Sequence, residues 1–363
     1  MNNMHIFLFV GTIDALMSII GYMYYRHYLP FGRTLTFGLI YLLMALGTAI
    51  SVILPQGTPH FLLKLTAWIE GLWIAFCYYT LLLAIIHLLC LLFSKLGGWQ
   101  LPSAKISIIG LAFICCFITL GSWRAFHPTV RTEALVTEKL PQNAHYKIVF
   151  LTDLHMGRIL GHDYAERLAA RINEQKPDFV VVSGDMLDER IFYVEEEDTL
   201  SALAQIKAPV YMAFGNHDYL DEPLRWQQML TDKGFYILRN TDTIIDNKIK
   251  ITGIDDYSKN RTNNQLINLS SQNEDYYSIL LDHQPRRMDA AAAAGYDLYL
   301  AGHTHTGQLF PNRPVTKKMY KLDYGRTNFG NLTAITNNGY GFWGPPVRTE
   351  IAPEMVVLEL RGK

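Results

Sequence analysis

Polar side chains with metal-binding chemistry follow five apolar, β-rich runs in the second part of the sequence, at the point where each run ends. The endings read Asp-Leu-His (153–155), Gly-Asp (184–185), Gly-Asn-His-Asp (215–218), Asp-His (282–283) and Gly-His-Thr-His (302–305). In open α/β sheets, ligands bind beyond the carboxyl ends of the strands, so these endings are expected to meet at one place. Side chains two residues apart in an extended backbone point to the same face, so each Asp-x-His or His-x-His pair can address one centre.

The chemistry of this set predicts two divalent metal ions. So many carboxylate, imidazole and amide groups at one sheet edge would be destabilised by repulsion and desolvation without a cation. Imidazole together with carboxylate and amide oxygen, and without thiolate, suits Mn, Fe or Zn, with Mn as the first choice. The set is too large for one tetrahedral site, which predicts a pair of metals with Asp185 as the bridging carboxylate. Gly184, Gly215 and Gly302 are expected to permit tight turns and close backbone approach.

The ordered motifs resemble those of the calcineurin-like metallophosphoesterases, over roughly residues 146–361. The resemblance implies two packed mixed β-sheets flanked by helices, with a dinuclear metal centre at the strand ends. It also implies three ligands for the first metal, three for the second and one bridging ligand. A further pair acts on the substrate: a histidine lies over the phosphate, and an aspartate orients the ring of that histidine. In that order, the residues are Asp153, His155 and His305; Asn216, His283 and His303; Asp185; and His217 and Asp218.

The closing segment, GYGFWGPPVR at 339–348, resembles the membrane-associated branch that contains YkuE-like and UDP-diacylglucosamine hydrolase-like enzymes. The implied activity is hydrolysis of a phosphodiester or diphosphate bond by direct attack of a metal-bridging hydroxide. Because the catalytic part begins shortly after an apolar region, a membrane-embedded substrate would be at high effective concentration. We therefore expect a lipid or lipid-linked substrate.

Two alternatives remain open from the sequence. One is an anchored phosphatase or nucleotide phosphodiesterase that acts on soluble substrates. The other is a non-catalytic membrane sensor that uses the same fold. A degenerate site should have lost ligands, whereas all seven expected ligand positions are filled here, which favours an enzyme.

The elements that must position these residues alternate between strands and helices from Lys147 onward. Strands are predicted at the runs KIVFLTD, FVVVSGD, PVYMAFGN, TIIDN, KIKITGID, YSILLDH, DLYLAGH, LTAITN and MVVLEL, with a hairpin turn at 246–248. Helices are predicted around 164–175, 199–206, 223–233 and 288–294. Residues 311–331 are expected to form a long loop. Such alternation is typical of an α/β layered domain with a mixed sheet or two.

The first 125 residues are a different kind of sequence. They contain only eight of the chain's 65 charged side chains, and four long apolar stretches lie at about 4–25, 35–54, 68–93 and 106–123. A helix needs about 20 apolar residues to cross a bilayer. We therefore predict a four-helix transmembrane region at 1–125, a linker at 126–145 and a metallophosphoesterase domain at 146–363.

Charge and cysteine usage restrict the possible binding partners and the cellular location. The chain carries a formal net charge of −1, which gives no support to a nucleic-acid partner, and no oligomeric state is predicted. All four cysteines lie in the apolar part, which excludes a thiolate zinc site after residue 125. Basic residues are slightly more frequent in the first and third connections between the apolar stretches. By the positive-inside rule, this predicts a multi-pass cell-membrane protein with an extracytoplasmic catalytic domain.

Overall fold

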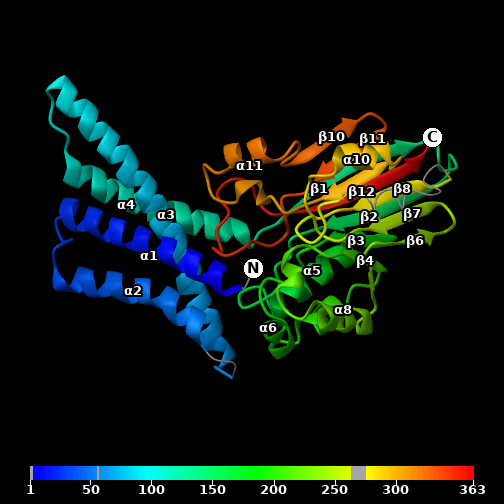
Figure 1. The fold of residues 1–363 in the computed structure, drawn as a ribbon, viewed down its shortest axis with the longest axis horizontal. Helices are drawn as coiled ribbons and strands as arrows, with labels where there is room; N and C mark the ends of the chain where they lie inside the picture. Colours follow the sequence, from blue (N-terminus) through cyan, green and yellow to red (C-terminus); the bar gives the residue numbers. More distant parts are fainter. Residues whose placement is uncertain (1–2, 55–56, 263–274) are drawn as a thin grey trace. The chain divides into compact units, whose positions relative to one another are not determined.

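The computed structural model describes residues 3–54, 57–262 and 275–363, with only the backbone described for residues 3–10 and 51–53. The chain divides into two compact units (Figure 1). A helical unit comprises residues 1–123 together with 344–349, and a sheet unit comprises 124–343 and 350–363.

The sheet unit is built on two six-stranded mixed sheets. The first has the order β1-β12-β2-β3-β4-β5 and the second has the order β10-β11-β9-β8-β7-β6. The strands of the first sheet are β1 (Thr129–Thr137), β2 (His145–Leu151), β3 (Phe179–Ser183), β4 (Val210–Ala213), β5 (Phe235–Ile237) and β12 (Glu354–Gly362). Those of the second are β6 (Thr241–Ile245), β7 (Ile249–Gly253), β8 (Tyr277–Leu281), β9 (Leu298–Ala301), β10 (Gly325–Phe329) and β11 (Leu332–Thr336).

The sheets pack face to face through a shared apolar core, and helices cover their outer faces. Phe150 and Val181 of the first sheet lie in one buried cluster with Ile279 and Leu300 of the second. The helices are α5 (His162–Gln175), α6 (Ile191–Glu196), α7 (Thr199–Leu203), α8 (Pro223–Asp232), α10 (Met288–Ala293) and α11 (Arg313–Met319). Because the central strands are buried on both faces, they read as continuous apolar runs, which is why the sequence predicts them well. The predicted α/β fold of two mixed sheets flanked by helices is confirmed.

Two segments of this unit differ from expectation. The predicted linker at 126–145 contains β1, which pairs in parallel with β12 from Thr129↔Glu354 to Thr137↔Gly362. Only Leu135 of this edge strand is buried. Its sequence therefore lacks the continuous apolar run by which the central strands are recognised. The predicted long loop at 311–331 contains α11 and β10. Pro314 stands in the first turn of α11, where its missing N–H costs no hydrogen bond.

The helical unit contains α1 (Asn3–Tyr28), α2 (Leu35–Ile53), α3 (His60–Gly97) and α4 (Ser103–Ala125). Four helices are present as predicted, but the prediction of four membrane spans is corrected. Among the described residues, only α3 and α4 are long and apolar enough to cross a membrane. The apolar part of α2, Leu35–Ile50, is shorter than a span requires, and the described part of α1 carries Asp14 and Arg26.

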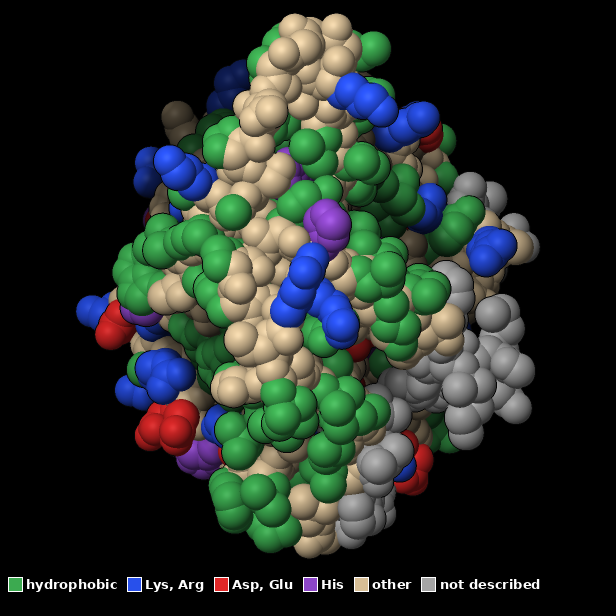
Figure 2. All heavy atoms as spheres, turned by 90° about the vertical axis from the view of Figure 1, so that its left-hand side faces the viewer, with side chains coloured by type: hydrophobic (Ala, Val, Ile, Leu, Met, Phe, Trp, Pro, Cys, Tyr) green, Lys and Arg blue, Asp and Glu red, His purple; other side chains and the backbone are tan. Residues whose placement is uncertain are grey.

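The outer faces of these helices are apolar. Leu88, Leu96 and Ile109 are each about two-thirds exposed or more, at 67%, 76% and 68%. Figure 2, which looks onto the left-hand side of Figure 1, shows many hydrophobic side chains on this face. Soluble proteins rarely expose large apolar patches, so these exposed apolar side chains make the unit suited to contact with lipid.

Residues 344–349 pack inside the helical unit, although the residues before and after them in sequence belong to the sheet unit. The N–H of Arg348 donates to the carbonyl of Gly121 at 2.9 Å, and the hydroxyls of Tyr79 and Thr349 are 2.6 Å apart. At Gly71, an added Cβ would lie 2.4 Å from Pro346 Cδ. A glycine is therefore needed there for this segment to approach the helix.

Candidate metal centre

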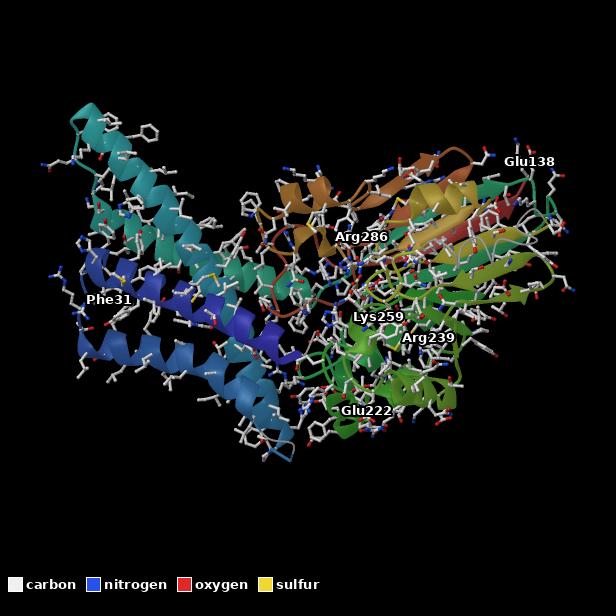
Figure 3. All side chains as sticks on the ribbon, in the orientation of Figure 1. Phe31, Glu138, Glu222, Arg239, Lys259 and Arg286 are labelled. Atoms are coloured by element: carbon white, nitrogen blue, oxygen red, sulfur yellow. The ribbon has the colours of Figure 1, made fainter. Side chains whose placement is uncertain are left out.

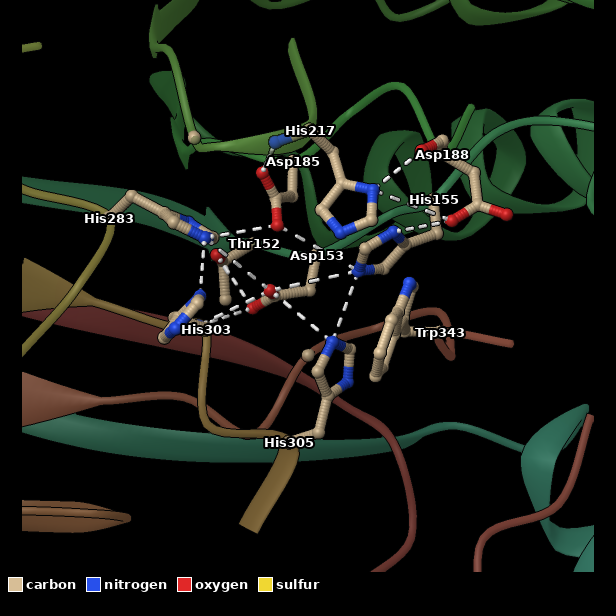
Figure 4. A network of polar contacts seen from close by, with 12 residues as sticks. Thr152, Asp153, His155, Asp185, Asp188, His217, His283, His303, His305 and Trp343 are labelled. Carbon is tan, nitrogen blue, oxygen red and sulfur yellow. Dashed lines mark hydrogen bonds and ion pairs between the residues drawn. The ribbon is translucent and has the colours of Figure 1, made fainter. Parts of the chain in front are cut away.

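The predicted site residues come together at the carboxyl ends of the central strands (Figure 4). Asp153 and His155 follow β2, Asp185 follows β3, and His217 begins the short 3₁₀ helix after β4. His283 follows β8, while His303 and His305 follow β9. The two sheets thus bring these endings to one place, as the strand-end argument predicts.

Three overlapping groups of side chains have ligand atoms within 4.8 Å of one another. They are Asp153, His155 and His305; His155, Asp185 and His217; and Asp185, His283 and His303. His155 joins the first two groups and Asp185 joins the last two. The contacts are short: His283 Nε2 lies 3.0 Å from Asp185 Oδ2, and His305 Nε2 lies 3.4 Å from Asp153 Oδ1.

Two of the site histidines, His155 and His283, have a hydrogen-bond acceptor beside Nδ1, the ring nitrogen that faces away from the site. Nδ1 of His155 lies 3.1 Å from Asp188 Oδ1, and Nδ1 of His283 lies 2.8 Å from the Ser183 carbonyl. An acceptor at Nδ1 holds a neutral ring as the Nδ1–H tautomer, which leaves the Nε2 lone pair facing the site. Metal-binding histidines have this arrangement. Asp188 is the acidic residue that fills this role for His155. Asp255 and Asp256 contact other groups instead.

Two further observations fit a cation. The Asn216 amide oxygen is buried and has no hydrogen-bond partner among the described residues, although buried polar atoms are normally paired. The N–H of the next residue, His217, donates to Asp185 Oδ1 at 2.8 Å, so Asn216 belongs to the same turn. The donors are imidazole, carboxylate and amide, a set suited to divalent first-row metals.

The electrostatics point the same way. Burial opposes protonation of His283, yet the Asp185 carboxylate raises its pKa well above the ordinary value. Burial also opposes ionisation of Asp185, but the neighbouring His283 holds its pKa well below the ordinary value. His303 has a pKa lowered to about 4 by burial and by the charge on His283. The buried carboxylates are therefore stabilised by positive charge, and the imidazoles of His283 and His303 cannot both carry that charge.

The backbone at the site is strained. Asp153, His155, Asp185, His303 and His305 all have positive φ, between 45° and 71°. Non-glycine residues adopt this region at a cost, and such strain concentrates at functional sites.

All three predicted glycines are needed for close approach. An added Cβ at Gly184 would lie 2.4 Å from Gly215 N, one at Gly215 would lie 2.2 Å from Asp185 Oδ1, and one at Gly302 would lie 2.4 Å from Asp153 Oδ2. The interpretation of these glycines is confirmed at all three positions.

The role predicted for Asp218 is wrong. Its buried carboxylate accepts the backbone N–H groups of Asp185, Met186, Leu187 and Gly215, and the indole N–H of Trp226. No bond to the His217 ring is among these contacts. Burial and the nearby Asp185 raise the pKa of Asp218 to about 6. Asp218 therefore holds the turns that carry Asp185 and Asn216, rather than orienting a ring.

Asp188 takes the role that was predicted for Asp218. Nδ1 of His217 lies 2.5 Å from the Asp188 carbonyl and 3.8 Å from its carboxylate. Trp343 belongs to the closing segment at 339–348, and its ring centroid lies 6.0 Å from that of His217. The backbone N–H of Trp343 donates to the Gln308 side-chain oxygen, and the backbone carbonyl of Trp343 accepts from the Gln308 side-chain NH₂. No local pattern indicates this position, because Trp343 lies 126 residues from His217 in the chain.

A two-sheet α/β fold with histidines, aspartates and an asparagine converging at the strand ends defines the domain of a metal-dependent phosphoesterase. Residues 146–307 match the family described as calcineurin-like phosphoesterase, and the chain belongs to that family.

Relatives agree with this assignment. An uncharacterised metallophosphoesterase of Aquifex aeolicus is 30% identical over 244 residues, which cover 64% of this chain and 92% of that protein. Another, from Campylobacter jejuni, is 32% identical over 60% of this chain, and the chain spans 59% of that relative's length. The predicted resemblance to YkuE is confirmed by 29% identity to YkuE of Bacillus subtilis, over 60% of this chain and 79% of that protein.

One relative is similar beyond the catalytic domain. A transmembrane protein with metallophosphoesterase domain from Danio rerio is 25% identical over 332 residues, which cover 84% of this chain and 74% of that protein. The sheet unit makes up only about two-thirds of this chain, so the similarity extends into the helical unit.

Proposed function

We propose that the chain is a membrane-associated phosphoesterase that uses two divalent metal ions to hydrolyse a phosphodiester or diphosphate bond in a lipid or lipid-linked substrate. One observation carries the two-metal part. Three ligand groups overlap through His155 and Asp185, so the donors form a continuous row rather than one closed site. A single ion cannot satisfy a row of this length with tetrahedral or octahedral coordination.

Within this proposal, the donors divide between two ions. Asp153, His155 and His305 hold the first ion. Asn216, His283 and His303 hold the second, and Asp185 contacts both. Bound divalent ions supply charge that stabilises a phosphate and lowers the pKa of bound water. Manganese is the first candidate, with iron and zinc as the others.

His217 acts on the substrate in this proposal. It belongs to one ligand group, but its side chain is 13% exposed, whereas those of His155 and His283 are at most 1% exposed. It therefore borders the open side of the site. Nδ1–H of the ring donates to the Asp188 carbonyl, so Nε2 is the nitrogen that can donate a proton to the leaving oxygen. General acid catalysis of this kind contributes about 10²–10⁴-fold.

The lipid part rests on the helical unit. Two of its helices are long and apolar enough to span a membrane, and its outer faces expose large apolar side chains. The similarity to a transmembrane protein from Danio rerio, which extends into this unit, supports membrane association. An enzyme held at a bilayer encounters lipid substrates at high effective concentration.

Metal-reconstituted activity tests the proposed function. The full chain, purified in detergent, would be stripped with a chelator and reloaded with Mn²⁺, Fe²⁺ or Zn²⁺. Hydrolysis of CDP-diacylglycerol and phosphatidylglycerol in mixed micelles would be compared with that of UDP-glucose and bis-p-nitrophenyl phosphate. We expect metal-dependent activity with higher kcat/KM on a lipid. A preference for the soluble esters over both lipids contradicts the lipid part, and no metal-dependent activity contradicts the catalytic part.

The extracytoplasmic position of the catalytic domain remains part of the proposal. Lys95 near the end of α3 and Lys105 near the start of α4 flank the connection between these helices, and both are exposed. The positive-inside rule places such a connection in the cytoplasm and the chain after α4 on the other side. Reporter fusions after Lys363 test this: a fusion active only in the cytoplasm contradicts it.

A further inference from the structure

One exposed arginine beside the metal centre has no acidic partner. Arg286 lies on the loop after β8, three residues past His283, and is labelled in Figure 3. The other arginines of this neighbourhood are paired: Arg287 with Asp282, Arg239 with Asp255 and Arg158 with Glu189. Among the described residues, no carboxylate forms an ion pair with Arg286. Its charge is therefore available to a ligand.

Neutral groups hold the Arg286 guanidinium in place. Nε donates to the Gln284 side-chain oxygen at 3.1 Å, and Nη2 donates to the Tyr320 hydroxyl at 3.3 Å. The guanidinium carbon lies 4.6 Å from the centroid of the Tyr320 ring and 5.5 Å from that of Tyr257. Stacking on aromatic faces orients an arginine without neutralising it.

The supports of Arg286 are themselves fixed. The Gln284 amide donates to both carboxylate oxygens of Asp256 at 3.0 and 3.1 Å, and Asp256 is fully buried. Tyr320 is also buried, and its ring stands 6.0 Å from that of His303. A preorganised arginine loses less side-chain entropy on binding, so its contacts contribute more affinity.

These contacts place Arg286 on one side of the centre. Gln284 directly follows His283, and Tyr320 contacts His303, so Arg286 borders the group formed by Asp185, His283 and His303. His217 and Trp343 border the other group, beside His155. A phosphate at the centre would therefore have the proton donor on one side and, on the other, a guanidinium whose charge no carboxylate among the described residues neutralises.

We propose that Arg286 is a specificity-determining residue that binds a second phosphoryl group of the substrate, adjacent to the phosphate that is hydrolysed. The planar fork of a guanidinium matches two phosphate oxygens. A simple phosphodiester has no second anionic group to place there, so the residue selects a diphosphate. This inference rests on the proposed function and narrows its substrate class.

Binding of two inorganic probes to the manganese-loaded full chain tests the role of Arg286. Calorimetry would compare pyrophosphate with orthophosphate for wild type, Arg286→Gln and Arg286→Lys. Pyrophosphate should bind the wild type more tightly than orthophosphate does. Arg286→Gln should weaken pyrophosphate at least tenfold and orthophosphate less than twofold, because only the second phosphoryl group loses its partner. Arg286→Lys keeps the charge without the fork and should be intermediate.

A matched control separates this effect from a general loss of positive charge. Arg225 is an exposed arginine on α8 with acidic partners, Glu195 and Glu222, and Arg225→Gln should leave both affinities unchanged. The inference is overturned if Arg286→Gln weakens both probes equally, or neither, with unchanged melting temperature. It is also overturned if pyrophosphate binds the wild type no more tightly than orthophosphate.

The lipid assay distinguishes failure of this inference from failure of the proposed function. Hydrolysis of phosphatidylglycerol, but not of CDP-diacylglycerol, would leave a lipid phosphoesterase and overturn the role of Arg286. Absence of hydrolysis of both lipids, with the pyrophosphate contrast intact, would contradict the lipid substrate and support the anion site.

Discussion

The two units of this chain place their polar residues in different ways. In the sheet unit, the polar groups that can bind a metal ion stand directly after buried strands, where Asp153, Asp185 and His283 converge. In the helical unit, polar groups lie along the helices and bond to one another: Tyr24 bonds to Nδ1 of His87 at 2.9 Å, and Ser103 to its Nε2 at 3.1 Å. Such pairs join helices in an apolar setting. A polar residue therefore has a functional meaning when its position in the fold repeats from strand to strand, and a packing meaning when it is paired locally.

The largest effect that sharpens this comparison is expected at His217. His217→Ala should lower kcat about 10²–10⁴-fold, because it removes the proton donor without removing a proposed ligand. Metal content should stay at the wild-type value. His145→Ala is a matched control, since His145 is an exposed histidine of β2 bound to Glu359, and it should leave kcat unchanged. Loss of metal from His217→Ala would instead identify His217 as a ligand, as its place in a ligand group allows.

A structural effect follows from the contacts of Asp218. In Asp218→Asn, the amide NH₂ would face backbone N–H donors in a fully buried site, which costs about 2–4 kcal/mol. For a domain of this size, we expect the melting temperature to fall by about 5–12 °C. Asp289→Asn, at an exposed ion pair with Lys321, should change it very little. An equal melting temperature with altered kcat would restore the ring-orienting role.

The smallest of these effects tests the helical unit. Gly71→Ala would place a Cβ 2.4 Å from Pro346 Cδ and 3.2 Å from Pro345 Cα, and backbone atoms cannot easily give way. We expect a destabilisation of about 1–3 kcal/mol, measured by thermal unfolding in detergent. Gly11→Ala has nothing within 4 Å of the new Cβ and should be neutral or slightly stabilising. Equal behaviour of the two variants would show that the packing of 344–349 contributes nothing to stability.

The sequence predicts the strand-end site well because its logic is local and repeated. Asp153 and His155 can be placed from the run before them, and the carboxyl ends of parallel strands must share an edge. Asp218 could not be placed in this way. It follows His217 immediately, but neighbouring residues in a tight turn point in different directions, and its partners are backbone N–H groups of another strand ending. Trp343 is brought to His217 by the tertiary fold alone.

In the apolar region, the elements can be predicted from the sequence but their role and packing cannot. Its helices can be predicted from length and composition, but which of them span a bilayer cannot be deduced from apolarity alone, as α2 shows. The packing of residues 344–349 against Gly71 and Gly121 depends on contacts more than 200 residues apart in the chain. Small residues on a helix indicate that something approaches closely, without indicating what.

The central claim is that Asp185 joins two metal ions in one phosphoesterase site. The most direct measurement is the metal content of wild type and Asp185→Asn, determined by mass spectrometry after reloading with Mn²⁺, together with phosphoester turnover. The substitution keeps the size of the side chain and removes the charge that two cations share. We predict two ions per chain in the wild type, and one or none with turnover at background in the variant. Two ions retained by Asp185→Asn with wild-type turnover would contradict the account.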